Sequence, residues 1–145
     1  MEIYTIGFTK KPAEEFFELL RGAGIRRLVD VRLNNVSQLA AFTKRDDLRF
    51  FLRELCNADY VHEPRLAPTE DVLKAYQRKE ISWEQYDVAF RELLARREAE
   101  TLLSKSSFAT PTVLLCSEPT AEKCHRRLVA EYLAAAWGEA TVVHL

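Results

Sequence analysis

The chain has 145 residues, of which 48% are hydrophobic and 30% are charged. This balance is typical of globular proteins and excludes a disordered or fibrous chain. The length is enough for one well-buried core, so we expect a single domain over residues 1–145. The 21 Lys and Arg side chains nearly cancel the 22 Asp and Glu side chains. The whole-chain charge therefore attracts neither membrane nor nucleic acid, and nucleic acid stays open as a partner only through a local basic surface.

Three features predict a cytoplasmic protein. The opening residues lack the basic region and long apolar run of a secretory leader. No segment approaches the roughly 18 consecutive apolar residues of a membrane-spanning helix, so no membrane partner is expected. The cysteines number three, which is odd, and a chain of this size does not need a disulfide scaffold. We expect reduced thiols.

The amino-terminal part predicts a strand, a helix and a second strand. Ile3–Ile6 is a short apolar run before a glycine, and Arg27–Arg32 is a second strand-like run. Between them a helix starts at Pro12, with apolar residues at helical spacing: Phe16, Leu19, Leu20 and Ala23. Such a βαβ unit is parallel and right-handed. We expect its first strand to be central in the sheet.

The middle of the chain predicts one more helix, a strand and a helical insertion. The helix Asp46–Cys56 has four residues on its inward face: Leu48, Phe51, Leu52 and Leu55. Tyr60–His62 reads as a short third strand. Residues 69–104 look helical throughout, and the second of their two helices begins at Ser82, where Ser82 and Gln85 form a capping box.

The remaining residues predict a second βαβ unit. The apolar run Val113–Leu115 ends in the turn Cys116–Thr120, and an amphipathic helix follows to Ala136, with Pro119 and Thr120 at its first turn. A last strand follows at Thr141–Leu145. The elements together predict an α/β fold, a single-domain three-layer sandwich. A mostly parallel, Rossmann-like sheet of about five strands has helices on both faces and a helical insertion at residues 69–104.

Polar residues cluster where the predicted strands end, and ligands bind at that edge of open α/β sheets. Cys116 ends a strand beside a helix N-terminus, which favours a thiolate and hence a nucleophile. His125, near the same helix start, is expected to be neutral and able to act as a base. Glu118 can transfer a proton or orient a substrate. We predict Cys116, Glu118 and His125 as catalytic residues, although Cys116 as a small buried residue is an equal alternative.

Five further residues are predicted to bind substrate. They lie at the ends of three strands or on the helix that follows, and they are Asp30, Arg32, His62, Ser117 and Arg126. The two arginines suit an anionic substrate. The alternative is structural, since strand ends are generally polar, Asp30 and Arg32 can pair with each other, and Arg126 can be a solvated surface residue.

A zinc site is the alternative to a protein without a cofactor. Cys116, Cys124 and His125 supply ligand types within a short stretch, but the paired Cys-x-x-Cys spacing of zinc knuckles is missing. On a helix, Cys124 and His125 would point about 100° apart, which hinders joint chelation. Cys124 also shares an apolar stripe with Leu128 and Tyr132, which predicts a core position.

The sequence resembles the domain-of-unknown-function 488 family of bacteria and archaea over essentially the whole chain. The resemblance rests on Tyr4–Gly7, Leu28–Arg32, Leu114–Glu118 and Cys124–Arg126. It implies a compact α/β domain in which shared Cys, Glu, His, Arg and Asp positions form a site, without an established activity. One branch of the family usually has Gly where Ala41 stands here.

The cysteine loop is also faintly similar to rhodanese-like and cysteine-phosphatase domains. Their loop ends in an arginine about five or six residues after the cysteine, where this chain has Ala121 and Glu122. Glu118 would also repel a phosphate. Phosphatase and sulfurtransferase chemistry is therefore rejected, whereas other thiol chemistry stays open.

The leading functional hypothesis is a Cys-dependent or metal-assisted hydrolase or transferase for a small anionic or nucleotide-like substrate. One alternative is a module that binds nucleic acid or protein through the helical insertion, whose basic and aromatic residues interleave. These are Arg65, Lys74, Arg78, Lys79, Trp83, Tyr86, Arg91, Arg96 and Arg97. A zinc-stabilised structural domain is a further alternative, and a homodimer is left open.

Overall fold

The computed structural model describes residues 1–145 and contains one parallel sheet of five strands in the order β3-β2-β4-β1-β5. The strands are β1 (Glu2–Gly7), β2 (Arg27–Asp30), β3 (Asp59–His62), β4 (Thr112–Cys116) and β5 (Thr141–His144). Every residue of β4 is buried, as expected for the middle strand of a sheet covered on both faces. As predicted, β1 is an interior strand, since it pairs with β4 on one side and β5 on the other, but the middle strand of the five is β4.

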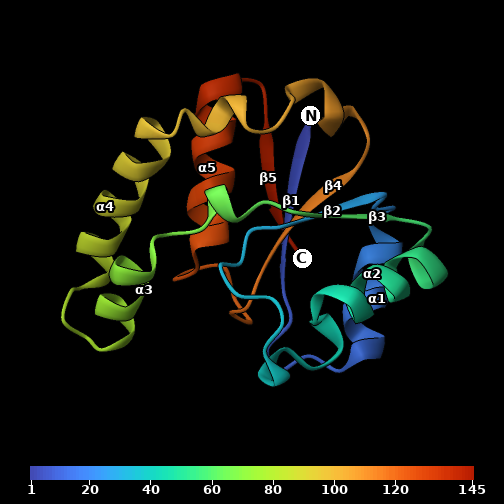
Figure 1. The fold of residues 1–145 in the computed structure, drawn as a ribbon. Coiled ribbons are helices and arrows are strands. Elements are labelled where there is room, and N and C mark those ends of the chain that lie inside the picture. The colour runs from blue at the N-terminus through green and yellow to red at the C-terminus, as the bar shows by residue number, and fades with distance from the viewer.

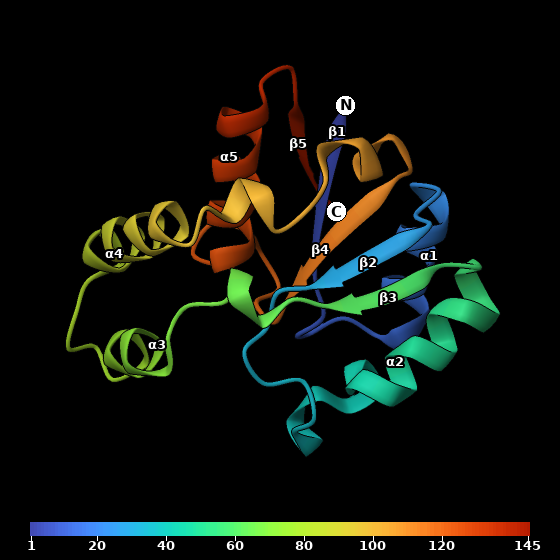
Figure 2. The ribbon, with the colours of Figure 1, turned by 45° about the horizontal axis from the view of Figure 1, so that its top comes forward.

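Helices cover both faces of the sheet (Figure 1). On one face lie α1 (Ala13–Gly22) and α2 (Arg45–Phe51), and on the other lie α3 (Glu70–Gln77), α4 (Trp83–Arg96) and α5 (His125–Trp137). Figure 2 shows α3 and α4 beside α5, on the far side of the sheet from α1 and α2. Each face has its own apolar core, so the predicted three-layer sandwich is confirmed. No helix combines the length and apolarity needed to cross a membrane.

Local signals placed most helix boundaries correctly. The predicted capping box is present, since the Ser82 hydroxyl accepts from the Gln85 N–H at 3.1 Å and the Gln85 side chain accepts from the Ser82 N–H at 2.9 Å. The inward position of Leu55 was wrong, because its side chain is 44% exposed. The chain continues from α2 as a π-helical turn, Leu52–Cys56, whose wider winding changes the direction of the later side chains.

The start of α5 also differs from the prediction. Pro119 and Thr120 do not begin the helix, which starts at His125 after a loop over residues 117–124. Arg126 donates to the Glu118 carbonyl at 2.6 Å, and Lys11 donates to the Pro119 carbonyl at 3.1 Å. These two bonds occupy the carbonyl groups of Glu118 and Pro119, which a helix starting at Pro119 would use for its own backbone bonds. Residues 117–124 therefore form an irregular loop.

Candidate active site at the ends of β2 and β4

The candidate site lies where two neighbouring strands send the chain to opposite faces of the sheet. After β2 the chain continues to α2 on one face, and after β4 it continues to α5 on the other. Such a switch point leaves a crevice at the carboxyl ends of the strands. A cavity of about 330 Å³ opens here, and α3 and α4 complete its wall.

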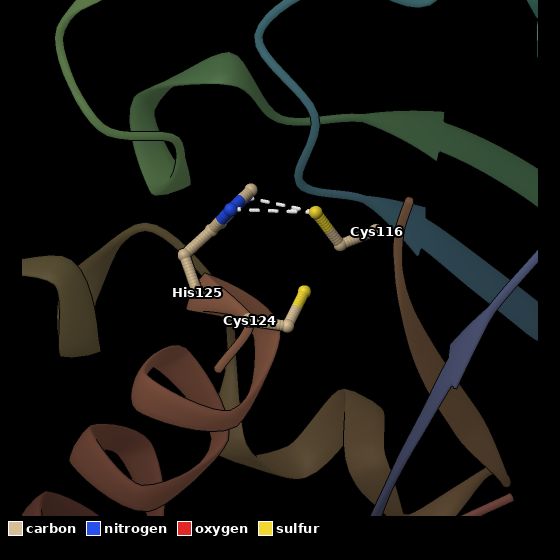
Figure 3. Close-up of side chains that lie close together, drawn as sticks. All are labelled: Cys116, Cys124 and His125. Atoms are coloured by element: carbon tan, nitrogen blue, oxygen red, sulfur yellow. Dashed lines mark hydrogen bonds between the residues drawn. The ribbon is translucent and has the colours of Figure 1, made fainter. Parts of the chain in front are cut away.

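Cys116 and His125 both line this cavity, and their side chains lie close together (Figure 3). Cys116 is the last residue of β4, and His125 is the first residue of α5. The Cys116 Sγ lies 3.3 Å from His125 Nδ1 and 3.5 Å from Nε2. Both residues are buried, but both form part of the cavity wall. The pair has the contact that a nucleophile and its base require.

The other partner of His125 determines its tautomer. Nε2 lies 2.7 Å from the carbonyl oxygen of Val31. A carbonyl can only accept, so Nε2 carries the proton and, in the neutral ring, Nδ1 is the unprotonated nitrogen. The Cys116 sulfur is nearly equidistant from the two nitrogens, so it lies against the face of the imidazole, and a turn of the ring is needed to aim the Nδ1 lone pair at it. Phe90 packs edge-on against the imidazole, with ring centroids 5.7 Å apart. The backbone after β2 thus orients the base as the third group of a catalytic triad would.

Cys124 joins the same cluster from the residue before α5. The ligand atoms of Cys116, Cys124 and His125 all lie within 4.8 Å of one another. The predicted obstacle to joint chelation is absent, because Cys124 has an extended backbone (φ −132°, ψ 138°) and is not part of the helix. Cys124 is both core and cavity wall. Its neighbour Cys116, followed by burial, raises the pKa of the Cys124 thiol.

Asp30 and Arg32 form a closed ionic cluster beside the cavity. The Arg32 guanidinium donates twice to the Asp30 carboxylate, at 2.8 and 2.7 Å, and twice to Thr43, at 3.0 and 2.7 Å. Tyr60 donates to the same carboxylate at 2.6 Å, and Asn35 donates to the Tyr60 hydroxyl at 2.9 Å. Burial opposes the charged form of Arg32, but Asp30 outweighs it and the pKa of Arg32 is raised. The hydrogen bonds of Asp30 and Arg32 are all made within the protein, as in a structural ion pair, although Arg32 is also one of the residues that line the cavity.

Arg126 is not on the surface, where the structural alternative had placed it. Its side chain is 1% exposed, makes no salt bridge, and donates to the Glu118 carbonyl and to Thr5 Oγ1, the latter at 3.4 Å. Gly7 allows this arrangement, because a Cβ there would stand 1.6 Å from the Glu118 carbonyl oxygen. Arg126 therefore holds the loop that carries Ser117 and Glu118.

The other predicted site residues divide into two groups. Ser117 and Glu118 line the cavity, next to Cys116 in the chain. His62, in contrast, is bonded through Nε2 to the Arg32 carbonyl at 2.8 Å and does not line the cavity. Asp30 and Arg126 are also outside its wall. The structure thus brings together Cys116, Ser117, Glu118, His125 and Arg32 from the predicted set.

A family model, described as domain of unknown function DUF488, matches residues 12–133. The chain belongs to the DUF488 family. No curated protein and no solved structure matches it in the corresponding comparisons. In this DUF488 chain four motifs suggested the family: Tyr4–Gly7, Leu28–Arg32, Leu114–Glu118 and Cys124–Arg126. The first three reach the carboxyl ends of β1, β2 and β4, and the fourth begins α5.

The DUF488 chain has an aromatic wall on this cavity, and it includes Trp83 and Tyr86, which were predicted as part of a nucleic-acid or protein binding surface on the helical insertion. Trp83 and Tyr86 of α4, and Tyr76 of α3, pack together and line the cavity. The four-residue spacing of Tyr86, Phe90 and Leu94 could have indicated an inward stripe. Basic neighbours are also engaged, since Arg91 pairs with Asp87 and Glu131, and Arg97 binds the carbonyls of Arg65 and Ala67.

Proposed function

We propose that the protein is an enzyme in which Cys116 attacks a small substrate as a thiolate, with His125 as its base. The observation that carries the proposal is the 3.3 Å contact between Cys116 Sγ and His125 Nδ1, in the lining of a cavity. The Val31 carbonyl supports it by holding the proton of the imidazole on Nε2. Thiol-dependent catalysis requires a nucleophile, a base in contact with it and a group that orients the base. Cys116, His125 and the Val31 carbonyl would fill these three roles.

The reaction would be a hydrolysis or transfer through a covalent thio-intermediate. His125 Nδ1 takes the proton of the Cys116 thiol, and the sulfur electron pair forms a bond to an electrophilic carbon of the substrate. The leaving group departs with its bonding electron pair and receives that proton from His125. Water or another acceptor then loses a proton to His125, bonds to the carbon and displaces the sulfur. The sulfur takes the proton back, and the thiol is restored.

The cavity suits a small substrate with an anionic group. Its volume of about 330 Å³ is near the lower end of small-molecule sites, roughly 300–1,000 Å³. Lys74 and Lys123 contribute to its wall, and Lys74 is paired with Glu70 at 2.7 Å. Lys123 makes no salt bridge, so we assign it to the anionic group. Glu118, on the same wall, is assigned to orienting the substrate, since His125 supplies the proton of the leaving group.

The test is site-resolved alkylation of the thiols with iodoacetamide as a function of pH. We expect Cys116 to react well below the unperturbed thiol pKa of about 8.5. Cys56 is an internal control, because it lies in the core of the opposite face and burial raises the pKa of its thiol. His125→Asn should slow alkylation of Cys116 near pH 7 by about tenfold or more, since the base is lost.

Two outcomes would contradict the nucleophile. One is a Cys116 that reacts no faster than Cys56 in metal-free protein across the whole pH range. The other is an unchanged Cys116 rate in a His125→Asn variant that melts like the parent protein. Cys116→Ser supplies the blank for the labelling and should leave the melting temperature nearly unchanged, because the substitution conserves volume.

A zinc centre is the second candidate, favoured by the three ligand atoms within 4.8 Å. Two thiolates and an imidazole suit Zn²⁺, and His125 Nδ1 is free to bind it because Nε2 donates to a carbonyl, as in many metal sites. A bound Zn²⁺ would supply a Lewis acid with one position open to the cavity. Native mass spectrometry of protein purified without chelator distinguishes the candidates: a bound metal with protected Cys116 and Cys124 supports zinc, and metal-free protein with a reactive Cys116 supports the nucleophile.

A further inference from the structure

The aromatic wall of the cavity is formed by Tyr76, Trp83 and Tyr86 from the helical insertion. The Trp83 and Tyr86 rings are stacked, with centroids 5.4 Å apart and planes 24° apart. Tyr76 lies against both, at 4.9 Å from Tyr86 and 5.7 Å from Trp83. All three line the cavity that contains Cys116 and His125. Trp83 stacks on Tyr86, the Arg127 guanidinium lies over the Trp83 ring, 5.7 Å from its centroid, and Tyr86 is 2% exposed, so the faces of these two rings are largely covered. A flat ring in the cavity would therefore meet the aromatic cluster mainly in edge-to-face contact.

The Tyr86 hydroxyl has no hydrogen-bond partner within the protein. Tyr86 is 2% exposed, yet its hydroxyl hydrogen-bonds to no other protein group and is not sealed off from the cavity. Burial, and then the neighbouring thiols of Cys116 and Cys124, raise its pKa, so the group stays a donor. Because the hydroxyl is accessible from the cavity and has no protein partner, it can donate to water in the free protein or to an acceptor on a bound ligand.

Other polar groups on the cavity wall can contact the edges of such a ring. The lining residues include Asn34 and Gln77, whose side-chain amides can each donate and accept. Glu118 and Lys123 contribute to the same wall. A plain hydrocarbon ring would leave these groups unpaired, at a cost in binding free energy. A heteroaromatic ring with donors and acceptors on its edge would satisfy them.

We propose that the cavity binds the base of a mononucleotide, with the ring against Tyr76, Trp83 and Tyr86 and an acceptor of the base hydrogen-bonded to the Tyr86 hydroxyl. The proposal rests on the proposed function in taking the cavity as the substrate site, and it names the substrate class. The volume of about 330 Å³ leaves room for one base and little more, which favours a single nucleotide over a polynucleotide.

The experiment uses the fluorescence of Trp83. The chain has two tryptophans, and Trp137 packs on Phe108 away from the cavity, so Trp137→Phe leaves Trp83 as the only reporter. Adenosine, guanosine, cytidine and uridine 5′-monophosphates are titrated into the full-length variant, with ribose 5-phosphate as the ring-free control. We expect saturable quenching by at least one nucleotide and none by ribose 5-phosphate. Tyr86→Phe should weaken that binding about tenfold, or about 1.4 kcal/mol.

Matched variants separate this proposal from the previous one. Tyr132→Phe removes a hydroxyl that binds Glu100 outside the cavity, and it should leave nucleotide affinity unchanged. Cys116→Ser should still bind the ring, so a failure of Cys116 as nucleophile leaves the ring subsite intact. No saturable response to any of the four nucleotides would overturn the proposal, as would equal quenching by ribose 5-phosphate or full affinity in Tyr86→Phe. Quenching by single-stranded oligonucleotides alone would overturn it too.

Discussion

Two polar clusters end neighbouring strands of one sheet, and they differ in what their groups bind. At the end of β2, Asp30 and Arg32 bind each other, and Thr43 and Tyr60 take up further hydrogen bonds. At the end of β4, the Cys116 thiol faces an imidazole and a cavity. We call the first the closed cluster and the second the open cluster. Both are buried and polar, so burial alone does not separate them.

The difference shows how structural polarity can be distinguished from functional polarity. A buried group that is fully hydrogen-bonded within the protein stabilises one arrangement and has nothing left for a ligand. A group such as the Tyr86 hydroxyl, which has no protein partner and is accessible from a cavity, remains available to a ligand. Hydrogen-bond donors and acceptors that have no protein partner are therefore a better indicator of a functional site than charged groups are.

The largest expected effect is on the closed cluster. Arg32→Met should lower the free energy of unfolding by about 3–5 kcal/mol, because it leaves the Asp30 carboxylate buried without its cation. Urea unfolding at neutral pH measures the loss. Cys116→Ser in the open cluster is the control, with an expected change of about 1.5 kcal/mol or less. Equal losses in the two variants would contradict the distinction between closed and open.

Gly7→Ala should disturb the open cluster and spare the closed one. The new Cβ would meet the Glu118 carbonyl oxygen at 1.6 Å, so the loop after Cys116 must move. We expect a loss of about 2 kcal/mol from overpacking, together with a changed alkylation rate of Cys116. Gly22→Ala, where a Cβ meets nothing within 4 Å, is the matched control for the glycine substitution. Parent-like stability and labelling in Gly7→Ala would refute the close approach.

Ala41→Gly should strengthen the segment that carries Thr43 to the closed cluster. Ala41 has φ 51° and ψ −125°, a conformation that glycine adopts far more easily, and it lies in the 3₁₀ segment Gln38–Thr43. We expect a gain of about 1 kcal/mol in the free energy of unfolding. Ala40→Gly, at a neighbouring residue without positive φ, should instead destabilise, and a loss in both variants would contradict the strain.

The smallest expected effect is on the pH dependence of stability, through His144 at the end of β5. Thr5 Oγ1 accepts from Arg126, so its own proton points to His144 Nδ1 at 2.5 Å. Burial and then Arg126 lower the pKa of His144, so its contribution to stability is complete above the unfolded pKa of about 6.5 and is lost as the pH falls below it. His144→Asn should therefore lose less stability than the parent between about pH 7 and pH 5. Parallel unfolding curves in that range would contradict the shift.

The sequence by itself was enough for the elements and for their class. Apolar periodicity, the capping box at Ser82 and the two βαβ units predicted a three-layer α/β sandwich, which the structure confirms. Local signals also located Cys116 at the end of a strand. These features depend on neighbours in the chain, where helical or strand spacing directly determines which side chains face the core.

Contacts between distant segments decided the rest. The position of β4 between β1 and β2, the contact of Arg126 with Thr5 and the bond from Lys11 to the Pro119 carbonyl all depend on residues far apart in the chain. No local pattern distinguishes an arginine that binds substrate from one that binds a carbonyl of its own protein. The same holds for Tyr86, since its hydroxyl is unpartnered only because of what the other segments leave open. Periodicity in the chain determined the layers, and the long-range hydrogen bonds of the folded state decided which polar groups remain available for chemistry.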